Sequence, residues 1–196
     1  MTKAERTRQS IIIKSAPLFN KKGVAGTALS DILKVTKLAK GSLYVHFKDK
    51  EELSHVVVDY HLTKLADVVE KAVSAQSSFR GKLFAYLDTF FDPLHPPLEG
   101  GCPMLNFGME ADDTDQVIRQ KVKALIDVAK LQIADLVRGG VRSGEFKDEV
   151  SPGEFAVKMF AMIEGGIMMS RIAGDNSTMK MIIRMLKKEI EQMKKK

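Results

Sequence analysis

The chain has 196 residues, 44% of them hydrophobic, and this length and composition allow a packed core and exclude an intrinsically disordered chain. No apolar run approaches the roughly 20 residues that cross a bilayer and no signal-peptide core follows the first charges, so we expect a cytoplasmic protein without a membrane segment. The net charge of +6 is uneven: residues 1–50 carry eleven basic and three acidic side chains, or +8, whereas the remainder carries 20 basic and 22 acidic ones, or −2.

Apolar residues recur at helical spacing along almost the whole chain, without a convincing alternating run, and this pattern predicts an all-α fold. A breaker-rich loop, "DPLHPPLEGG", interrupts the pattern at residues 92–101. The expected helices cover, in chain order, about 3–21, 27–36, two turns from 39, 49–75, 82–91, 104–111, 115–138, 152–173 and 178 to the C-terminus.

The first helix carries clear start, stop and core signals. We expect it to bury Ile12, Ala16 and Phe19 and to end at Gly23. Pro17 inside it removes a backbone hydrogen bond and favours a bend. Thr27 is able to cap the next helix.

The two short helices that follow form a helix-turn-helix pattern, in which the second helix enters the major groove of DNA. Lys40 and Lys50 can pair with phosphates, while Ser42, Tyr44 and His46 offer polar groups to phosphates or base edges. Gly41 allows the helix backbone to approach the DNA closely, whereas the apolar Leu43 and Phe47 are predicted to face inward. The excess positive charge of the segment fits a polyanionic partner, although charge alone leaves open a solvated basic face.

The stretch "GTALSDILKVTKLAKGSLYVHFKDKEEL" resembles the DNA-binding signature of the tetracycline-repressor (TetR) family of transcriptional regulators, with matches from about Arg6 to Tyr60. The resemblance implies a helix-turn-helix head at residues 1–50, with the signature reaching about residue 60, and a helical ligand-binding and dimerisation body at residues 51–196. It further implies a homodimer that represses transcription from a pseudo-palindromic double-stranded operator and is released by a small molecule. The DNA-contacting positions it implies are Thr27, Lys40, Gly41, Ser42, Tyr44, His46 and Lys50.

Two positions depart from the family pattern. Lys37 stands where the family commonly has glycine in the turn, and a left-handed residue with a side chain costs about 1 kcal/mol. Either the turn is adjusted or a phosphate contact by Lys37 offsets this cost, and we add Lys37 to the DNA-binding set. Ala39 replaces the Ser or Thr that often caps the recognition helix, which removes one polar contact.

The body is expected to supply the dimer interface and the effector pocket. Two amphipathic helices at 152–173 and from 178 onward predict a four-helix bundle between two subunits, although a monomeric core would use the same apolar positions. The interface residues we expect are Phe155, Met159, Ile163, Ile167, Ile183, Leu186 and Ile190. Flexible methionines and aromatic rings indicate a pocket for an apolar or aromatic effector, against the alternative of a dry core. Its expected lining is Phe84, Phe91, Met104, Phe107, Met109, Met162 and Glu164.

Cys102 precedes the helix at 104–111, where a thiol can become reactive, so an electrophile- or redox-sensing repressor is one alternative and a buried structural cysteine is another. The acidic cluster around Glu110 and Asp115 fits a solvated turn with a capping Asp. No metal set, cofactor motif or catalytic nucleophile with a base is evident, so we expect no enzyme. Two alternatives from other classes remain: an enzyme that uses the Cys102 or Glu164 region on a helical scaffold, and a helical interaction module whose basic head binds acidic protein.

Overall fold

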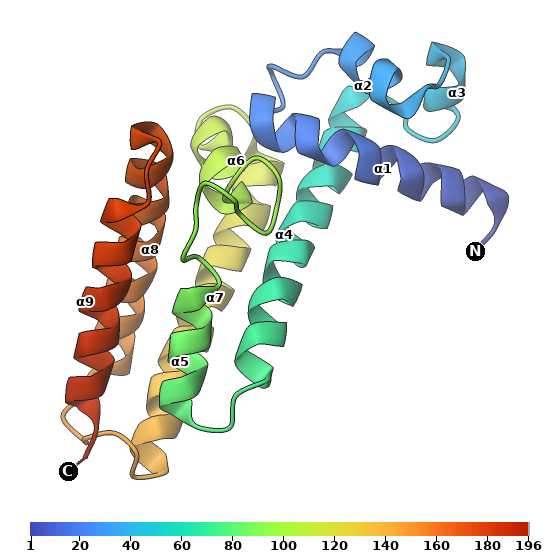
Figure 1. The fold of residues 1–196 in the computed structure, drawn as a ribbon. Helices are drawn as coiled ribbons and strands as arrows, with labels where there is room; N and C mark the ends of the chain where they lie inside the picture. The colour runs from blue at the N-terminus through green and yellow to red at the C-terminus, as the bar shows by residue number, and fades with distance from the viewer. Residues whose placement is uncertain (196) are drawn as a thin grey trace. The chain divides into compact units, whose positions relative to one another are not determined.

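The computed structural model describes residues 1–195, and these form nine helices and contain no strand, which confirms the predicted all-α fold. No helix in this range is long and apolar enough to span a membrane. The helices are α1 (Lys3–Lys22), α2 (Leu29–Thr36), α3 (Lys40–Tyr44), α4 (Lys50–Ser74), α5 (Phe79–Asp88), α6 (Pro103–Ala111), α7 (Gln116–Arg142), α8 (Pro152–Ala173) and α9 (Ser177–Met193) (Figure 1).

The chain packs as two compact units. The first contains residues 1–65 and 98–123, and the second contains residues 66–97 and 124–196. Two of the three boundaries fall within the long helices α4 and α7, so each of these helices contributes residues to both units, and the third falls in the loop between α5 and α6.

In the first unit, α1 has the signals that the sequence predicts. Thr2 and Glu5 form a capping box at its start, which satisfies two backbone N–H groups. Gly23 ends the helix with φ +76°, a conformation that favours glycine, and Pro17 lies inside the helix. The predicted core positions of α1 are confirmed as buried: Ile12, Ala16 and Phe19.

The start of α2 differs from the prediction. Ala28, not Thr27, is the N-terminal capping residue, and no side chain caps the helix. Thr27 is fully buried and its hydroxyl donates to the carbonyl of Gly23 at 2.6 Å. Because this hydrogen bond closes the turn after α1, the Thr27 side chain does not cap α2.

The short α3 is held by its apolar face. Leu43 and Phe47 are buried, as predicted, and the guanidinium of Arg8 lies 4.4 Å from the centre of the Phe47 ring. Arg8 also pairs with Glu52 of α4 at 3.1 Å. Since helices this short are unstable alone, the burial of Leu43 and Phe47 and the contact of Arg8 in α1 with Phe47 hold α3 in place.

In the second unit, α8 and α9 pack closely against each other, and α9 also packs against α5 (Figure 1). Gly174 in the left-handed conformation ends α8 and allows the short turn into α9. A Cβ added to Gly166 would lie 2.6 Å from the sulfur of Met179, so glycine allows this close packing without displacing that side chain. Glu145 accepts hydrogen bonds from the amides of Phe79 and Arg80 and thereby caps α5.

Candidate nucleic-acid interface

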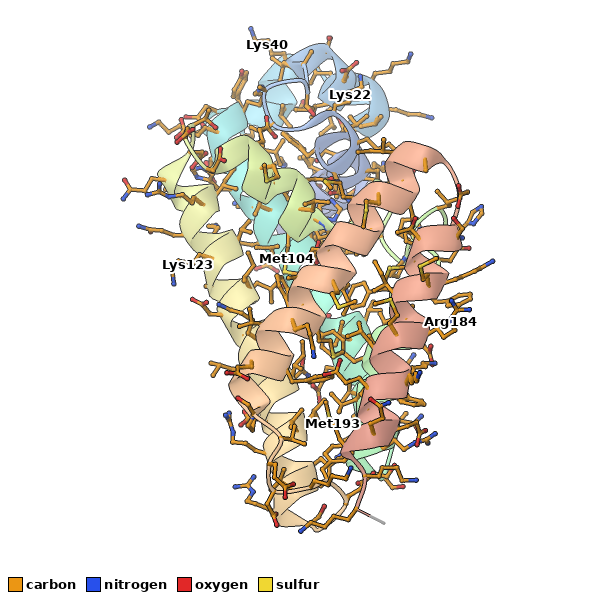
Figure 2. The ribbon with its side chains drawn as sticks, turned by 90° about the vertical axis from the view of Figure 1, so that its left-hand side faces the viewer. Lys22, Lys40, Met104, Lys123, Arg184 and Met193 are labelled. Carbon is orange, nitrogen blue, oxygen red and sulfur yellow. The ribbon has the colours of Figure 1, made fainter. Side chains whose placement is uncertain are left out.

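One face of α3 is exposed and carries the polar side chains that the sequence analysis selected. Lys40, Gly41, Ser42 and Tyr44 are exposed, whereas Leu43 on the opposite side is buried. The ammonium of Lys40 lies 6.0 Å from the centre of the Tyr44 ring, so these two groups share the exposed face. Figure 2 shows Lys40 projecting outward from the ribbon. A cation, a hydroxyl and a phenol thus form one surface able to donate hydrogen bonds to phosphate.

Packing within the protein does not require a glycine at position 41. A Cβ added there would meet no atom within 4 Å, so no neighbouring group requires a glycine. His46 lies after α3, is half-buried, and donates its backbone N–H to the carbonyl of Leu43 at 3.0 Å. An open glycine on a polar face allows the backbone of another molecule to approach α3.

In the turn between α2 and α3, Lys37 keeps the left-handed conformation, one of the two outcomes expected there. Its φ of 57° and ψ of 32° are left-handed, and it is the only non-glycine residue with positive φ among those the structure describes. Its side chain is exposed. Ala39 begins α3 without a side-chain cap, also as expected. The turn therefore retains the helix-turn-helix geometry and places a strained lysine on its surface.

Two residues of the predicted DNA-binding set bond to the protein's own backbone. Thr27 is 0% exposed, so the contact expected of its side chain is wrong: burial and the hydrogen bond to Gly23 remove it from the surface. Lys50 differs from the expectation in its partners, because its ammonium donates to the carbonyls of Val24 at 2.8 Å and Thr27 at 3.0 Å. Lys50 therefore braces the turn between α1 and α2.

The same turn is held from its other side by a carboxylate that the sequence analysis placed in a solvated cluster. Glu110 of α6 accepts the amide of Val24 at 2.8 Å and that of Ala25 at 2.7 Å. A Cβ at Gly23 would lie 2.6 Å from the Glu110 carboxylate, so glycine makes room for this contact. The only hint in the sequence is the glycine pair around the turn, because the partner is 86 residues away.

Buried polar groups join α6 and its preceding loop to α1. The side-chain amide of Asn20, which is buried, donates to the carbonyls of Glu99 at 2.9 Å and Gly101 at 3.1 Å. Asn106 of α6 donates in turn to the carbonyl and side-chain oxygens of Asn20. Since buried hydrogen bonds of this kind are costly to break, α1 and α6 are specifically positioned against each other.

His61 of α4 completes this contact between helices. Its Nε2 lies 2.8 Å from the carbonyl of Ala16, and its ring centre lies 5.7 Å from that of Phe107 in α6. Burial lowers the pKa of His61, and the hydrogen bond to Ala16 opposes this effect only partly. Its Nδ1 is buried without a hydrogen-bond partner.

The acidic cluster after α6 contains the capping Asp that was expected. Asp115 accepts the amides of Val117 and Ile118 at 2.9 Å and lies 3.0 Å from His55. Burial raises the pKa of Asp115, but the Ile118 amide and His55 outweigh this, and the net pKa is lowered. Among the described residues, no group of three or more His, Cys, Asp or Glu side chains is arranged to hold a metal ion.

The residues proposed to line an effector pocket are divided between the two units. Met104 and Phe107 are buried in the first unit, but Met109 is 68% exposed, which is wrong for a pocket wall. Met109 points to the outer side of α6 because Phe107 and Ala111 occupy the inner side.

Cys102, the candidate reactive thiol, is buried at the start of α6, and its side chain does not cap the helix.

In the second unit, Phe91 is exposed and the half-buried Phe84 contacts cations. The ring of Phe84 has the cations of Arg80 at 4.3 Å and Lys187 at 4.9 Å from its centre, and Phe91 is 45% exposed. Cation–π contacts at the surface account for these rings without a ligand. Met162 and Glu164 on α8 are half-buried.

The residues proposed for the dimer interface are correct as an apolar face but lie inside the protomer. All seven are buried in one chain because they pack α8 against α9 and the rest of the second unit: Phe155, Met159, Ile163, Ile167, Ile183, Leu186 and Ile190. A second, exposed apolar face remains on the same two helices. It comprises Val157, Met168, Met169 and Ile172 of α8 and Met181 and Met185 of α9, and we call it the outer face.

The outer face has the features of an interface between helices. On α8, Met168 lies eleven positions after Val157 and Ile172 four positions after Met168, so these three share one side of the helix, and Ile172 is 81% exposed. Gly165 lies within the same stretch, and a Cβ there would meet nothing within 4 Å. Exposed apolar side chains beside an open glycine allow another helix to pack closely.

The comparisons with known proteins agree with one another: the matching family models, solved structures and relatives are all transcriptional regulators. Residues 11–57 match the family model described as bacterial regulatory proteins of the tetR family, and residues 80–186 match the tetracyclin repressor-like C-terminal domain. A TetR-family regulator from Cytophaga hutchinsonii has a solved structure that is 33% identical, with a TM-score of 0.93 over 100% of this chain and 98% of that one. A TetR regulator from Chloroflexus aurantiacus is 35% identical, with a TM-score of 0.94 over 99% and 98%. The transcriptional repressor DhaR of Mycobacterium sp. strain GP1 is 24% identical over 84% of this chain and 82% of its own.

Proposed function

Because the chain belongs to the TetR family of helix-turn-helix transcriptional regulators, which bind DNA and are not enzymes, we propose that it is a repressor released from its operator by a small molecule. The observation that carries this proposal is the exposed polar face of α3 over its buried Leu43 and Phe47. The name of the relative DhaR supports repression as the direction of control. We assign the protein to the cytoplasm, where its DNA lies.

We propose that α3 enters the major groove and that Lys37, Lys40, Ser42 and Tyr44 contact DNA, with His46 at the edge. Gly41 would let the phosphate backbone or a base edge approach α3. Phosphate contacts fix the register of a protein on the duplex, while base contacts specify the sequence. Residues 1–50 form the DNA-binding domain in this proposal and residues 51–196 form the regulatory body. Lys50 acts indirectly, by bracing the turn between α1 and α2.

A pseudo-palindromic operator requires two heads, and we propose that the outer face forms the homodimer interface. Its six large apolar side chains, exposed at 44–81%, would be costly to leave in water but would be buried in a four-helix bundle of α8 and α9 from two subunits. The proposed interface therefore uses the exposed sides of α8 and α9, whereas the residues expected from the sequence lie on the buried sides of the same helices.

We retain an apolar or aromatic small molecule as the proposed effector. Met104 and Phe107 in the first unit and Met162 and Glu164 in the second support it, whereas Met109 and Phe91 are exposed and the ring of Phe84 contacts cations. Thioether and aromatic side chains suit ligands of that class.

The test is a selection of bound sequences from a random duplex pool with the purified protein, followed by titration of the enriched sequence. We expect an inverted repeat bound by dimers. Tyr44→Ala should weaken binding to the selected and to random duplexes in similar proportion if Tyr44 contacts phosphate. Phe107→Ala, at a buried site, is the control that shows how a folding defect affects DNA binding. Weak, uniform binding without enrichment would contradict the proposal and favour an interaction module.

A further inference from the structure

The N-terminal half of α1 borders a groove beside the helix-turn-helix. Its volume is about 280 Å³, and α1 contributes most of its lining, while Thr36 and Leu38 come from the end of α2 and the turn before α3. The α1 residues in the lining are Lys3, Arg6, Thr7, Ser10, Ile11 and Lys14. Three cations and three hydroxyls therefore line the groove, and no carboxylate does.

A second groove, of about 310 Å³, lies along the same helix. Arg6, Ser10 and Lys14 line both grooves, and again no carboxylate is present in the lining. Lys3, Arg6 and Lys14 are exposed. Arg6 donates one hydrogen bond to the carbonyl of Met1 at 3.1 Å, which leaves most of its five N–H donors for another partner. These three cations and Ser10 form a continuous ridge on α1, which we call the α1 ridge.

The α1 ridge is suited to a polyanion of regular repeat. Residues at positions 3, 6, 10 and 14 are three or four apart and so share one side of the helix. From Lys3 to Lys14 the ridge extends roughly 16 Å, several times the 3.4 Å axial spacing of phosphates on one DNA strand. The acid nearest in sequence, Glu5, is held at the helix start, where it accepts the amide of Thr2 at 2.8 Å. Lys3, Arg6 and Lys14 take part in none of the ion pairs among the described residues, so their charges remain available to a partner molecule.

We propose that the α1 ridge binds the DNA phosphate backbone next to the major groove occupied by α3, so that the footprint extends beyond the helix-turn-helix. The groove ends at Leu38, two residues before the start of α3, and the exposed Lys37 lies between Thr36 and Leu38. A helix in a major groove about 12 Å wide has a phosphate strand on each side, which brings backbone charge next to the residues that flank its start. This inference rests on the proposed DNA binding. It identifies a contact surface on α1 that adds affinity without sequence preference.

The experiment compares the wild type with the triple variant Lys3→Ala, Arg6→Ala and Lys14→Ala. All three side chains are exposed and alanine favours helix, so the variant should fold, which circular dichroism will verify. Lys21→Ala is the matched control, since it removes one cation from the same helix, where it pairs with Glu99 and does not line either groove. Affinities for the selected operator and for a random duplex are titrated from 50 to 200 mM salt.

We expect the triple variant to lose affinity for both duplexes by the same factor and its salt dependence to be shallower by about 2.7 per protomer, whereas the control retains both. If the wild type binds the operator and the triple variant binds it with the same affinity and salt dependence, the proposed role of the α1 ridge is wrong, but the proposed function stands. A wild type that enriches no operator, yet binds random duplex with a slope that the variant lacks, would overturn the repressor proposal and support the ridge. No DNA binding by the wild type would overturn both.

Discussion

The carboxylate of Glu110 in α6 accepts the backbone amide of Val24 in the turn between α1 and α2, at 2.8 Å. The Ala25 amide donates to its other oxygen, and Lys50 holds carbonyls of the same turn. The turn is thus held by two charged side chains: the Glu110 carboxylate accepts hydrogen bonds from its N–H groups, and the Lys50 ammonium donates hydrogen bonds to its carbonyls. Hydrogen bonds to a charged partner are roughly twice as strong as neutral ones.

We expect Glu110→Gln to lower the free energy of unfolding by about 1–3 kcal/mol, because the new amide group would face a backbone N–H with another donor. Urea denaturation gives the comparison. The control is Glu99→Gln, which removes an ion pair with Lys21 whose side chains are 62% and 52% exposed and should cost less than about 1 kcal/mol. Equal losses in the two variants would mean that the paired bonds to the turn contribute no more than a surface ion pair.

Lys37 combines a strained backbone with an exposed charge, and substitutions can separate the two. Lys37→Gly should raise the free energy of unfolding by about 0.5 kcal/mol, because relief of roughly 1–2 kcal/mol of left-handed strain exceeds the roughly 0.5–1 kcal/mol of added backbone entropy. It should also weaken DNA binding, with a salt dependence shallower by about 0.9 per protomer. Lys37→Ala removes the cation but keeps the strain, so it should weaken binding without the gain in stability. Full affinity in both variants would exclude a phosphate contact by Lys37.

The outer face can be tested by placing like charges on it. Met168→Glu combined with Ile172→Glu should raise the dissociation constant of the dimer by roughly 100-fold or more, because burying like charges against each other costs several kcal/mol. Sedimentation velocity reports the change from dimer to monomer. Met109→Glu, at a methionine that is 68% exposed on α6, should leave the dimer intact. A dimer that survives the double substitution would require another interface.

His61 makes the stability of the protein depend on pH. Burial lowers its pKa below the value of about 6.5 that it has in the unfolded chain, so the unfolded state takes up a proton that the folded state resists. The stabilisation is complete above about pH 6.5 and is lost as the pH falls towards the folded-state pKa. Midpoints of thermal unfolding between pH 7.5 and 5 should therefore fall less steeply for His61→Gln, which keeps a donor for Ala16 but does not titrate. Parallel pH profiles would show that His61 does not contribute.

The sequence was sufficient wherever the deciding interactions are local. The ends of α1 follow from residues within a few positions of each other and are confirmed. The recognition helix begins close to Ala39 as predicted, although with five residues it is shorter than the two turns expected. Lys37 takes the left-handed conformation, one of the two outcomes expected there. The burial of Leu43 and Phe47 is confirmed as well, because a four-residue spacing fixes their common side on the short recognition segment.

Other features required the packing of distant residues. Thr27 is a good capping residue by type, yet the turn buries it and leaves Ala28 at the start of α2. Glu110 looked like part of a solvated acidic turn until the fold brought Val24 to it. In both cases the side chain had two suitable partners, and the tertiary contact selected one of them.

The sequence by itself determined the all-α fold, the helix-turn-helix and the excess of positive charge at the N-terminal end, because helical periodicity, turn residues and charge are properties of short segments. It could not determine which side of α8 is inside. That helix is apolar nearly all round, and Met159 and Met168 are equally hydrophobic, so periodicity cannot distinguish them. Only packing against α9 decided it, burying Met159 and leaving Met168 45% exposed on the outer face.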